Sequence, residues 1–196
     1  MRLLKFSVLS LLMLFSAQVF SAGSPLPTLR TAANNMIASL EKNKSQLKSR
    51  QVISRIVAQN LMPVIDQTRM AQLVVGRDAW SKASASERNA FIQSFRQMVI
   101  STYAAALASY DGDTIKFYPM RGQGGSTAVV RSVIVRRTGQ TIGITYNCRL
   151  VGGRWKVYDF SIENVSMVNS YRSQFASIVS QKGLSGLVAQ MRARRR

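Results

Sequence analysis

Two different spacings of hydrophobic residues divide the chain. Up to residue 110, apolar side chains recur every three or four positions, as on one face of an α-helix. Between residues 114 and 161 they recur at every second position, as in strands with one buried face. Helical spacing returns from residue 165. Helices first and strands later predict an α+β fold, with helices packed on one face of the sheet.

Three amphipathic helices are expected before residue 80. Their apolar positions lie in residues 29–40, 52–61 and 70–74. Asp66 can cap the third of these helices, and Gly76 suits the position that follows its end.

The fourth helix has the clearest pattern. Ser84 and Glu87 have the spacing of a capping box, in which each residue satisfies a backbone N–H of the other. A stripe at helical spacing follows and predicts about seven turns. The stripe consists of Phe91, Phe95, Met98, Val99, Thr102, Tyr103, Ala106 and Tyr110.

A four-stranded antiparallel meander is expected next. Gly139 lies in one predicted turn, and Gly152 with Gly153 forms a tight hairpin turn. Two helices should close the chain. The predicted strands cover residues 114–117, 127–137, 141–150 and 154–161, and the predicted closing helices cover residues 165–181 and 184–193.

The last predicted strand has apolar side chains on both faces. Simple alternation points Trp155 and Val157 one way, and Tyr158 and Phe160 the other. One explanation is that the C-terminal helices, whose apolar stripe starts at Val165, cover the second face. The other is an apolar cavity between sheet and helices that holds a ligand. The pattern alone leaves both open.

The N-terminus has the three parts of a secretory signal peptide. Arg2 and Lys5 precede an apolar run over residues 6–20, and small residues suitable for cleavage follow up to Gly23. An N-terminal membrane anchor is the alternative, although the run is short for a membrane span. We therefore expect residues 1–23 to be a signal peptide and residues 24–196 to form a single domain in the periplasm.

The chain is strongly basic, with a formal net charge of +19 and an isoelectric point near 11.4. Such a charge often indicates nucleic-acid binding, but export argues against nucleic acid as a partner. Membrane surfaces, lipid head groups and acidic protein patches are the anionic partners expected outside the cytoplasm. A solvated basic surface without a specific partner is the alternative.

Few residues offer catalytic chemistry. The chain has no histidine, which excludes Ser-His-Asp and Cys-His catalysis. Cys148 lies on an apolar strand face, as a core residue would. Asp159 could be the general base of an enzyme with a cone-shaped pocket, with Tyr103 or Tyr146 as electrophile. The favoured interpretation is instead that Asp159 and Glu163 pair with arginines such as Arg172.

Several motifs together resemble the MlaC/toluene-tolerance family. Residues 75–80 (VGRDAW) and 84–88 (SASER) are similar to its LGR-x-W…ATPEQR region, and residues 102–110 (TYAAALASY) also match it. Residues 153–159 (GRWKVYD) and 163–175 (ENVSMVNSYRSQF) resemble the family's GRWKVYD…EGVSLVNNYRSQF.

The resemblance extends over about residues 34–194. Residues 183–187 (GLSGL) match the family's closing EG-x-x-GL element. Two departures are Asn164, where the family often has Gly, and residues 181–182, where an acid often precedes Gly183. Neither departure touches the apolar stripe.

The resemblance implies a periplasmic phospholipid shuttle, not an enzyme. Such proteins carry lipid between an outer-membrane lipoprotein–porin complex and an inner-membrane ABC transporter with a lipid-binding domain, and so maintain outer-membrane lipid asymmetry. Transient membrane contact is implied as well. The implied fold is an α+β cone related to the nuclear-transport-factor-like shape, with acyl chains between sheet and helices.

No cofactor is expected, and a bound phospholipid is the cargo. We predict the lining of its pocket from strand faces and helix stripes, because no lipid-contact motif is evident. The predicted lining residues are Leu73, Val74, Trp80, Val99, Tyr103, Tyr146, Tyr158, Phe160, Val168 and Tyr171.

Overall fold

The structure is a computed structural model that describes residues 23–120 and 125–193. Nearly all of the predicted signal peptide therefore lies outside the described residues. The elements in chain order are α1 (Leu26–Lys42), a 3₁₀ turn (Lys44–Gln46), α2 (Arg50–Asn60), a 3₁₀ turn (Met62–Val64), α3 (Gln67–Val75), α4 (Arg77–Lys82), α5 (Ala85–Ala108), β1 (Thr114–Phe117), β2 (Thr127–Val135), β3 (Thr141–Val151), β4 (Arg154–Ile162), β5 (Val165–Ser166) and α6 (Met167–Ala193).

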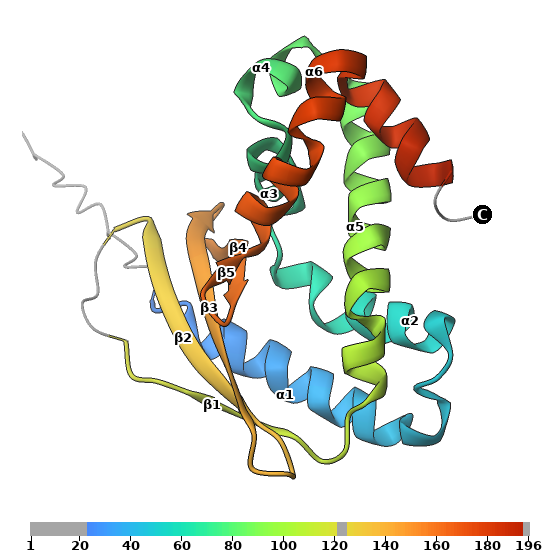
Figure 1. Cartoon of the computed structure of the whole chain (residues 1–196). Helices are drawn as coiled ribbons and strands as arrows, with labels where there is room; N and C mark the ends of the chain where they lie inside the picture. Colours follow the sequence, from blue (N-terminus) through green and yellow to red (C-terminus); the bar gives the residue numbers. More distant parts are fainter. Residues whose placement is uncertain (1–22, 121–124, 194–196) are drawn as a thin grey trace, which may run out of the picture.

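The predicted α+β fold with an antiparallel meander is confirmed. The strands pair in the order β1-β2-β3-β4-β5, each antiparallel to the next. Figure 1 shows the sheet on one side of the molecule, with α1 crossing it and α5 standing opposite. The helical layer above the sheet consists mainly of α3, α5 and α6.

The predicted helix boundaries follow from local hydrogen bonds. Asp66 Oδ1 accepts a hydrogen bond from the Arg69 amide at 3.0 Å and so caps α3. Gly76 ends α3 with φ 85°, a conformation that favours glycine. The capping box of α5 is complete: Glu87 Oε2 accepts from the Ser84 amide at 2.8 Å, and Ser84 Oγ accepts from the Glu87 amide at 3.2 Å.

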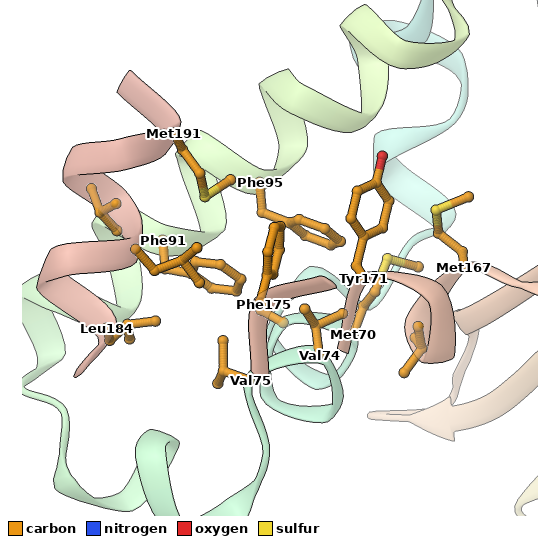
Figure 2. Close-up of a cluster of buried hydrophobic side chains, with 14 residues drawn as sticks. Met70, Val74, Val75, Phe91, Phe95, Met167, Tyr171, Phe175, Leu184 and Met191 are labelled. Atoms are coloured by element: carbon orange, nitrogen blue, oxygen red, sulfur yellow. The ribbon is translucent and has the colours of Figure 1, made fainter. Parts of the chain in front are cut away.

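The core of the helical layer is an aromatic cluster between α5 and α6. Figure 2 shows the rings of Phe91 and Phe95 from α5 against Tyr171 and Phe175 from α6. Phe91 and Phe95 stack with ring centroids 5.5 Å apart, and Phe95 meets Tyr171 edge to face at 5.1 Å. All four side chains are buried, so this half of the α5 stripe joins the helices to one another.

The last helix has a break where the sequence predicts one. Gly183 has φ 65° and ψ −169° inside α6, a left-handed conformation that turns the chain without a side-chain clash. The part after the break returns to the helical core through Leu184, Leu187 and Met191.

The expected four strands are five, because residues 165–166 form a short strand before α6 begins. Glu163 and Asn164 both have positive φ, at 48° and 66°, and make a two-residue hairpin turn between β4 and β5. Val165, which we expected in the apolar stripe of a helix, is therefore in β5 and is 61% exposed. The turn contains neither Gly nor Pro, so its sequence does not mark a hairpin.

A β-bulge in β4 corrects the expected strand faces. Asn147 pairs with Asp159 and Cys148 pairs with Val157, which leaves Tyr158 as an extra residue without a partner. The bulge brings Val157 and Phe160 to the same inner face, although their spacing in sequence predicts opposite faces. The sheet thus has one apolar inner face, and the inference of two apolar faces was wrong.

The inner face of the sheet packs against α1. Leu29 of α1 contacts a buried cluster of Val130, Cys148 and Val157. The outer face is open to solvent: Val129 is 52% exposed although its neighbour Val130 is fully buried. Sheet and helices therefore have separate cores, and the space between them is the candidate site.

Candidate functional site

An apolar cavity of about 390 Å³ lies between the sheet and the helices. The volume of this main cavity is within the range of small-ligand pockets. Its helical walls come from α2, from the segment that joins α2 to α3, from the start of α3 and from α5. Its other wall is the inner face of β2, β3 and β4. Its lining residues are Val57, Leu61, Met62, Ile65, Gln67, Met70, Ile92, Phe95, Arg96, Val99, Ile100, Tyr103, Ala106, Leu107, Ile134, Ile142, Ile144, Phe160 and Ile162.

A second cavity of about 250 Å³ adjoins the main cavity towards α1 and β1. The two share the lining residues Leu61, Ala106, Leu107, Ile134 and Ile142. The adjoining cavity also reaches Asp113 and Arg136, whose Oδ1 and Nε lie 3.1 Å apart. Together the cavities form a long apolar space beside α5.

A small side chain of α5 lies where the two cavities join. Ala106 belongs to the predicted apolar stripe and lines both cavities, so at this position α5 takes up little of the space. The α5 wall runs from Ile92 to Leu107, about 22 Å along the helix axis. This space can take an extended apolar chain.

A larger hollow, of about 850 Å³, lies between α3, α4 and the break in α6. Its lining includes the charged residues Arg77, Asp78, Lys82, Glu87 and Arg172. Because charged groups lose hydration against an apolar chain, this hollow fits such a ligand poorly despite its size.

Four of the ten predicted lining residues face the cavities. Val99, Tyr103 and Phe160 line the main cavity, and Tyr146 lines the adjoining one. Tyr103 and Phe160 meet across the main cavity with ring centroids 6.4 Å apart. The structure thus brings the α5 stripe and the β4 aromatic together from opposite sides of the main cavity.

The other six predicted residues line neither cavity. Val74, Val168 and Tyr171 are buried in the helical core, and Leu73 and Trp80 pack against that core. Tyr158 is the unpaired residue of the β4 bulge. The difference from the predicted lining has a physical reason: a buried apolar stripe looks the same in sequence whether it packs on another helix or faces a cavity.

The wall residues that the sequence interpretation missed lie mainly on the sheet and α5. Four isoleucines near the ends of β2, β3 and β4 form the sheet side, and Ile92 and Arg96 of α5 lie on the helix side. The isoleucines could have been found from the alternation of apolar and polar residues within each strand. The missed wall residues include Ile134, Ile142, Ile144, Ile162, Ile92 and Arg96.

The two cavity tyrosines stay neutral at physiological pH. Burial raises the pKa of Tyr103 above its ordinary value, and the nearby Tyr171 adds to this effect. Burial also raises the pKa of Tyr146, although a hydrogen bond with Ser132, at 3.1 Å between the hydroxyl oxygens, opposes the shift. Neutral phenols suit an apolar ligand.

Asp159 has a structural role at the start of α6. Its Oδ2 accepts a hydrogen bond from Ser166 Oγ at 2.8 Å, and its Oδ1 accepts from the Val168 amide at 3.1 Å. Ser166 Oγ in turn accepts from the Asn169 amide. The expected ion pairing was wrong for both acids, because Glu163 accepts a hydrogen bond from the Gly143 amide and Arg172 donates to the Leu73 carbonyl.

Replacing Asp159 by Ala is expected to lower the free energy of unfolding by about 1–3 kcal/mol. The buried carboxylate, 8% exposed, holds both a backbone donor and a hydroxyl at the helix start. Urea unfolding measures the change. Asp78→Ala, at an exposed acid, is the control and should change stability far less. Equal stability of the Asp159 and Asp78 variants would contradict the capping role.

Cys148 has no nucleophilic character in this environment. Its side chain is buried in the sheet core at 1% exposure, and burial raises the pKa of its thiol to about 12. The reactive thiolate is therefore absent at physiological pH.

Two further features bear on the type of protein. Within residues 23–120 and 125–193, no three Cys, Asp or Glu side chains gather as a metal site would require. In the same ranges, no helix has the length and apolar character needed to span a membrane.

Comparison with known proteins identifies relatives along most of the chain. The toluene tolerance protein ttg2D of Pseudomonas putida is 23% identical over 186 residues, covering 92% of this chain and 85% of that protein. The intermembrane phospholipid transport system binding protein MlaC of Haemophilus influenzae is 25% identical over 173 residues, covering 86% and 80%.

A solved structure shares the fold. The phospholipid-binding protein of Ralstonia solanacearum, determined in complex with a phospholipid, superposes with a TM-score of 0.82 at 28% sequence identity. The match covers 88% of this chain and 97% of that one. The model of the family described as MlaC protein matches residues 30–193. With that match over most of its length, the chain belongs to the MlaC family.

Proposed function

We propose that this protein binds a phospholipid and carries it through the periplasm. The observation that carries the proposal is the apolar space between sheet and helices, in which α5 and the inner sheet face form opposite walls. The relative from Ralstonia solanacearum, which holds a phospholipid, has the same fold. The relative from Haemophilus influenzae is named for intermembrane phospholipid transport.

Simple energetics explain why a carrier needs such a space. Exposing an acyl chain of about 16 carbons to water costs about 13 kcal/mol, at about 0.8 kcal/mol for each methylene. A basic residue near an anionic membrane contributes only about 1 kcal/mol. Positive charge can therefore bring the protein to a membrane, but only an apolar cavity keeps the lipid out of water.

The proposed route joins the two membranes of a Gram-negative cell. The protein would exchange lipid with an outer-membrane lipoprotein–porin complex and with an inner-membrane ABC transporter that has a lipid-binding domain. This exchange would maintain the lipid asymmetry of the outer membrane. The basic surface suits transient contact with anionic membranes along that route.

An enzyme that uses Asp159 is the weaker alternative. Asp159 lines neither cavity, and both of its carboxylate oxygens accept hydrogen bonds at the start of α6. Among the residues that the structure describes, Arg96 is the one charged side chain that lines the main cavity. This geometry favours binding over acid–base chemistry.

The direct test is to identify what the protein carries. The full chain, expressed in a Gram-negative host and purified from the periplasm, should show phospholipid adducts by native mass spectrometry. Extraction should return the same lipids chemically unchanged. A protein that emerges without lipid, and takes up none from phospholipid vesicles, would contradict the proposal.

A further inference from the structure

One charged side chain interrupts the apolar wall of the main cavity. Ile92, Arg96, Val99 and Tyr103 follow one another on α5 at spacings of four, three and four residues. That spacing places them on one face of the helix, and all four line the main cavity. Arg96 thus occupies a position where the helical pattern would place an apolar residue.

Arg96 has no acidic partner among the described residues. The chain has only eight acids, all of them described: Glu41, Asp66, Asp78, Glu87, Asp111, Asp113, Asp159 and Glu163. Every ion pair found in the described part of the chain joins other residues, namely Lys44 and Arg137 with Asp111, Arg136 with Asp113, and Arg149 with Asp66.

A second arginine, Arg136, also lines a cavity but differs from Arg96 in having an acidic partner. Arg136 lines the adjoining cavity and is neutralised by Asp113, with 3.1 Å between Nε and Oδ1. Arg96 lies beside a lining that is otherwise apolar except for Gln67 and the Tyr103 hydroxyl. The Arg96 side chain is partly buried, so its guanidinium loses part of its hydration without gaining a counter-charge from the described acids.

A ligand can supply that counter-charge. We propose that Arg96 binds the anionic phosphate of the lipid whose acyl chains fill the main cavity. The planar guanidinium can donate two parallel hydrogen bonds to two phosphate oxygens, a geometry that lysine cannot reproduce. Gln67, at the first position of α3, lines the same cavity and can add an amide donor.

The inference rests on the proposed function and defines its substrate class. Apolar chains enter the cavity, and one phosphate stays at Arg96. Diacylglycerol has the chains without the phosphate, and glycerol phosphate has the phosphate without the chains. Neither should bind as strongly as a phospholipid. The competing explanation is that the Arg96 stem only covers apolar surface while its charge stays in water.

The test compares Arg96→Met with the wild-type full chain, both stripped of lipid. Methionine keeps an apolar stem and removes the charge. Binding of phosphatidylglycerol, dioleoylglycerol and glycerol phosphate is measured by titration and native mass spectrometry. The Arg96→Met variant should lose phosphatidylglycerol affinity about tenfold or more, because hydrogen bonds to charged groups are among the strongest. Its dioleoylglycerol affinity should stay unchanged.

Two controls separate the explanations. Arg131→Met removes an exposed arginine from β2 and should leave every affinity unchanged. Arg96→Lys keeps the charge without the planar fork, so it should recover only part of the phosphatidylglycerol affinity. Equal phosphatidylglycerol binding by wild type and Arg96→Met overturns the role of Arg96.

Comparing the three ligands on the wild-type protein is a second test, which does not depend on any variant. If it binds dioleoylglycerol as tightly as phosphatidylglycerol, a phosphate site is excluded even if the variant fails to fold. If it binds glycerol phosphate alone as tightly as the lipid, the site serves free phosphate esters and the inference is overturned. If it binds none of the three, the proposed function itself is contradicted.

Discussion

Replacing Ala106 by Trp is expected to reduce phospholipid loading by at least tenfold while the protein stays folded. Ala106 lies where the two cavities meet, so an indole at this position fills the passage between them. The added apolar group occupies existing space, which limits the strain that overpacking of a filled core would cause. Native mass spectrometry of protein from the periplasm measures the loaded fraction.

Ala105→Trp is the matched control for this change. Ala105 is the preceding residue of α5 and is exposed, as Ala106 is, but it lines neither cavity. It receives the same side chain on the same helix, and its variant should load lipid like the wild type. Full loading of the Ala106→Trp variant would show that the lipid occupies a different part of the molecule.

Replacing Phe91 by Ala is expected to lower the free energy of unfolding by about 3–5 kcal/mol. The Phe91 ring is fully buried and contacts both Phe95, at 5.5 Å, and Phe175, at 6.4 Å between ring centroids (Figure 2). A domain of this size is stable by only about 5–15 kcal/mol, so the change takes a large share. Urea unfolding of lipid-free protein measures it.

Tyr118→Ala is the control for the aromatic core. Tyr118 is also aromatic but is 53% exposed, so its removal should change stability by about 0.5 kcal/mol or less. A loss below 1 kcal/mol for Phe91→Ala would mean that the cluster relaxes around the missing ring and does not hold α5 against α6.

The parts of the fold that were predicted correctly depend on short-range interactions. The capping box of Ser84 and Glu87 joins residues three positions apart. The hairpin turn at Gly152 and Gly153 depends only on the positive φ that these two glycines adopt. Asp66 and Gly76 mark the ends of α3 through their own backbone and side-chain preferences. Such signals are visible in sequence because they need no distant partner.

The parts that were missed depend on pairing between distant segments. The bulge at Tyr158 exists only because β3 and β4 pair in a particular register, and no residue type marks it. It changes which side chains of β4 face the helices. The short strand β5 likewise depends on Glu163 and Asn164, which adopt positive φ without glycine.

The candidate site could be predicted only in outline. The α5 stripe and a space between sheet and helices were recognised, and Tyr103 and Phe160 do meet at the main cavity, but the inner face of β4 was not. Where the stripe leaves the helical core and enters the cavity depends on the position of α6. Arg96 was overlooked because a charged residue is normally assigned to the solvent face.

The cavity also sets the response of this protein to hydrostatic pressure. Unfolding eliminates the voids inside a folded protein. A protein with larger voids therefore loses more volume when it unfolds, and pressure destabilises its folded state more. Sheet and helices have cores of their own, with the main cavity of about 390 Å³ between them, and a bound lipid would occupy part of this volume. The pressure at which the protein unfolds should therefore differ between lipid-free and lipid-loaded molecules, because their internal void volumes differ.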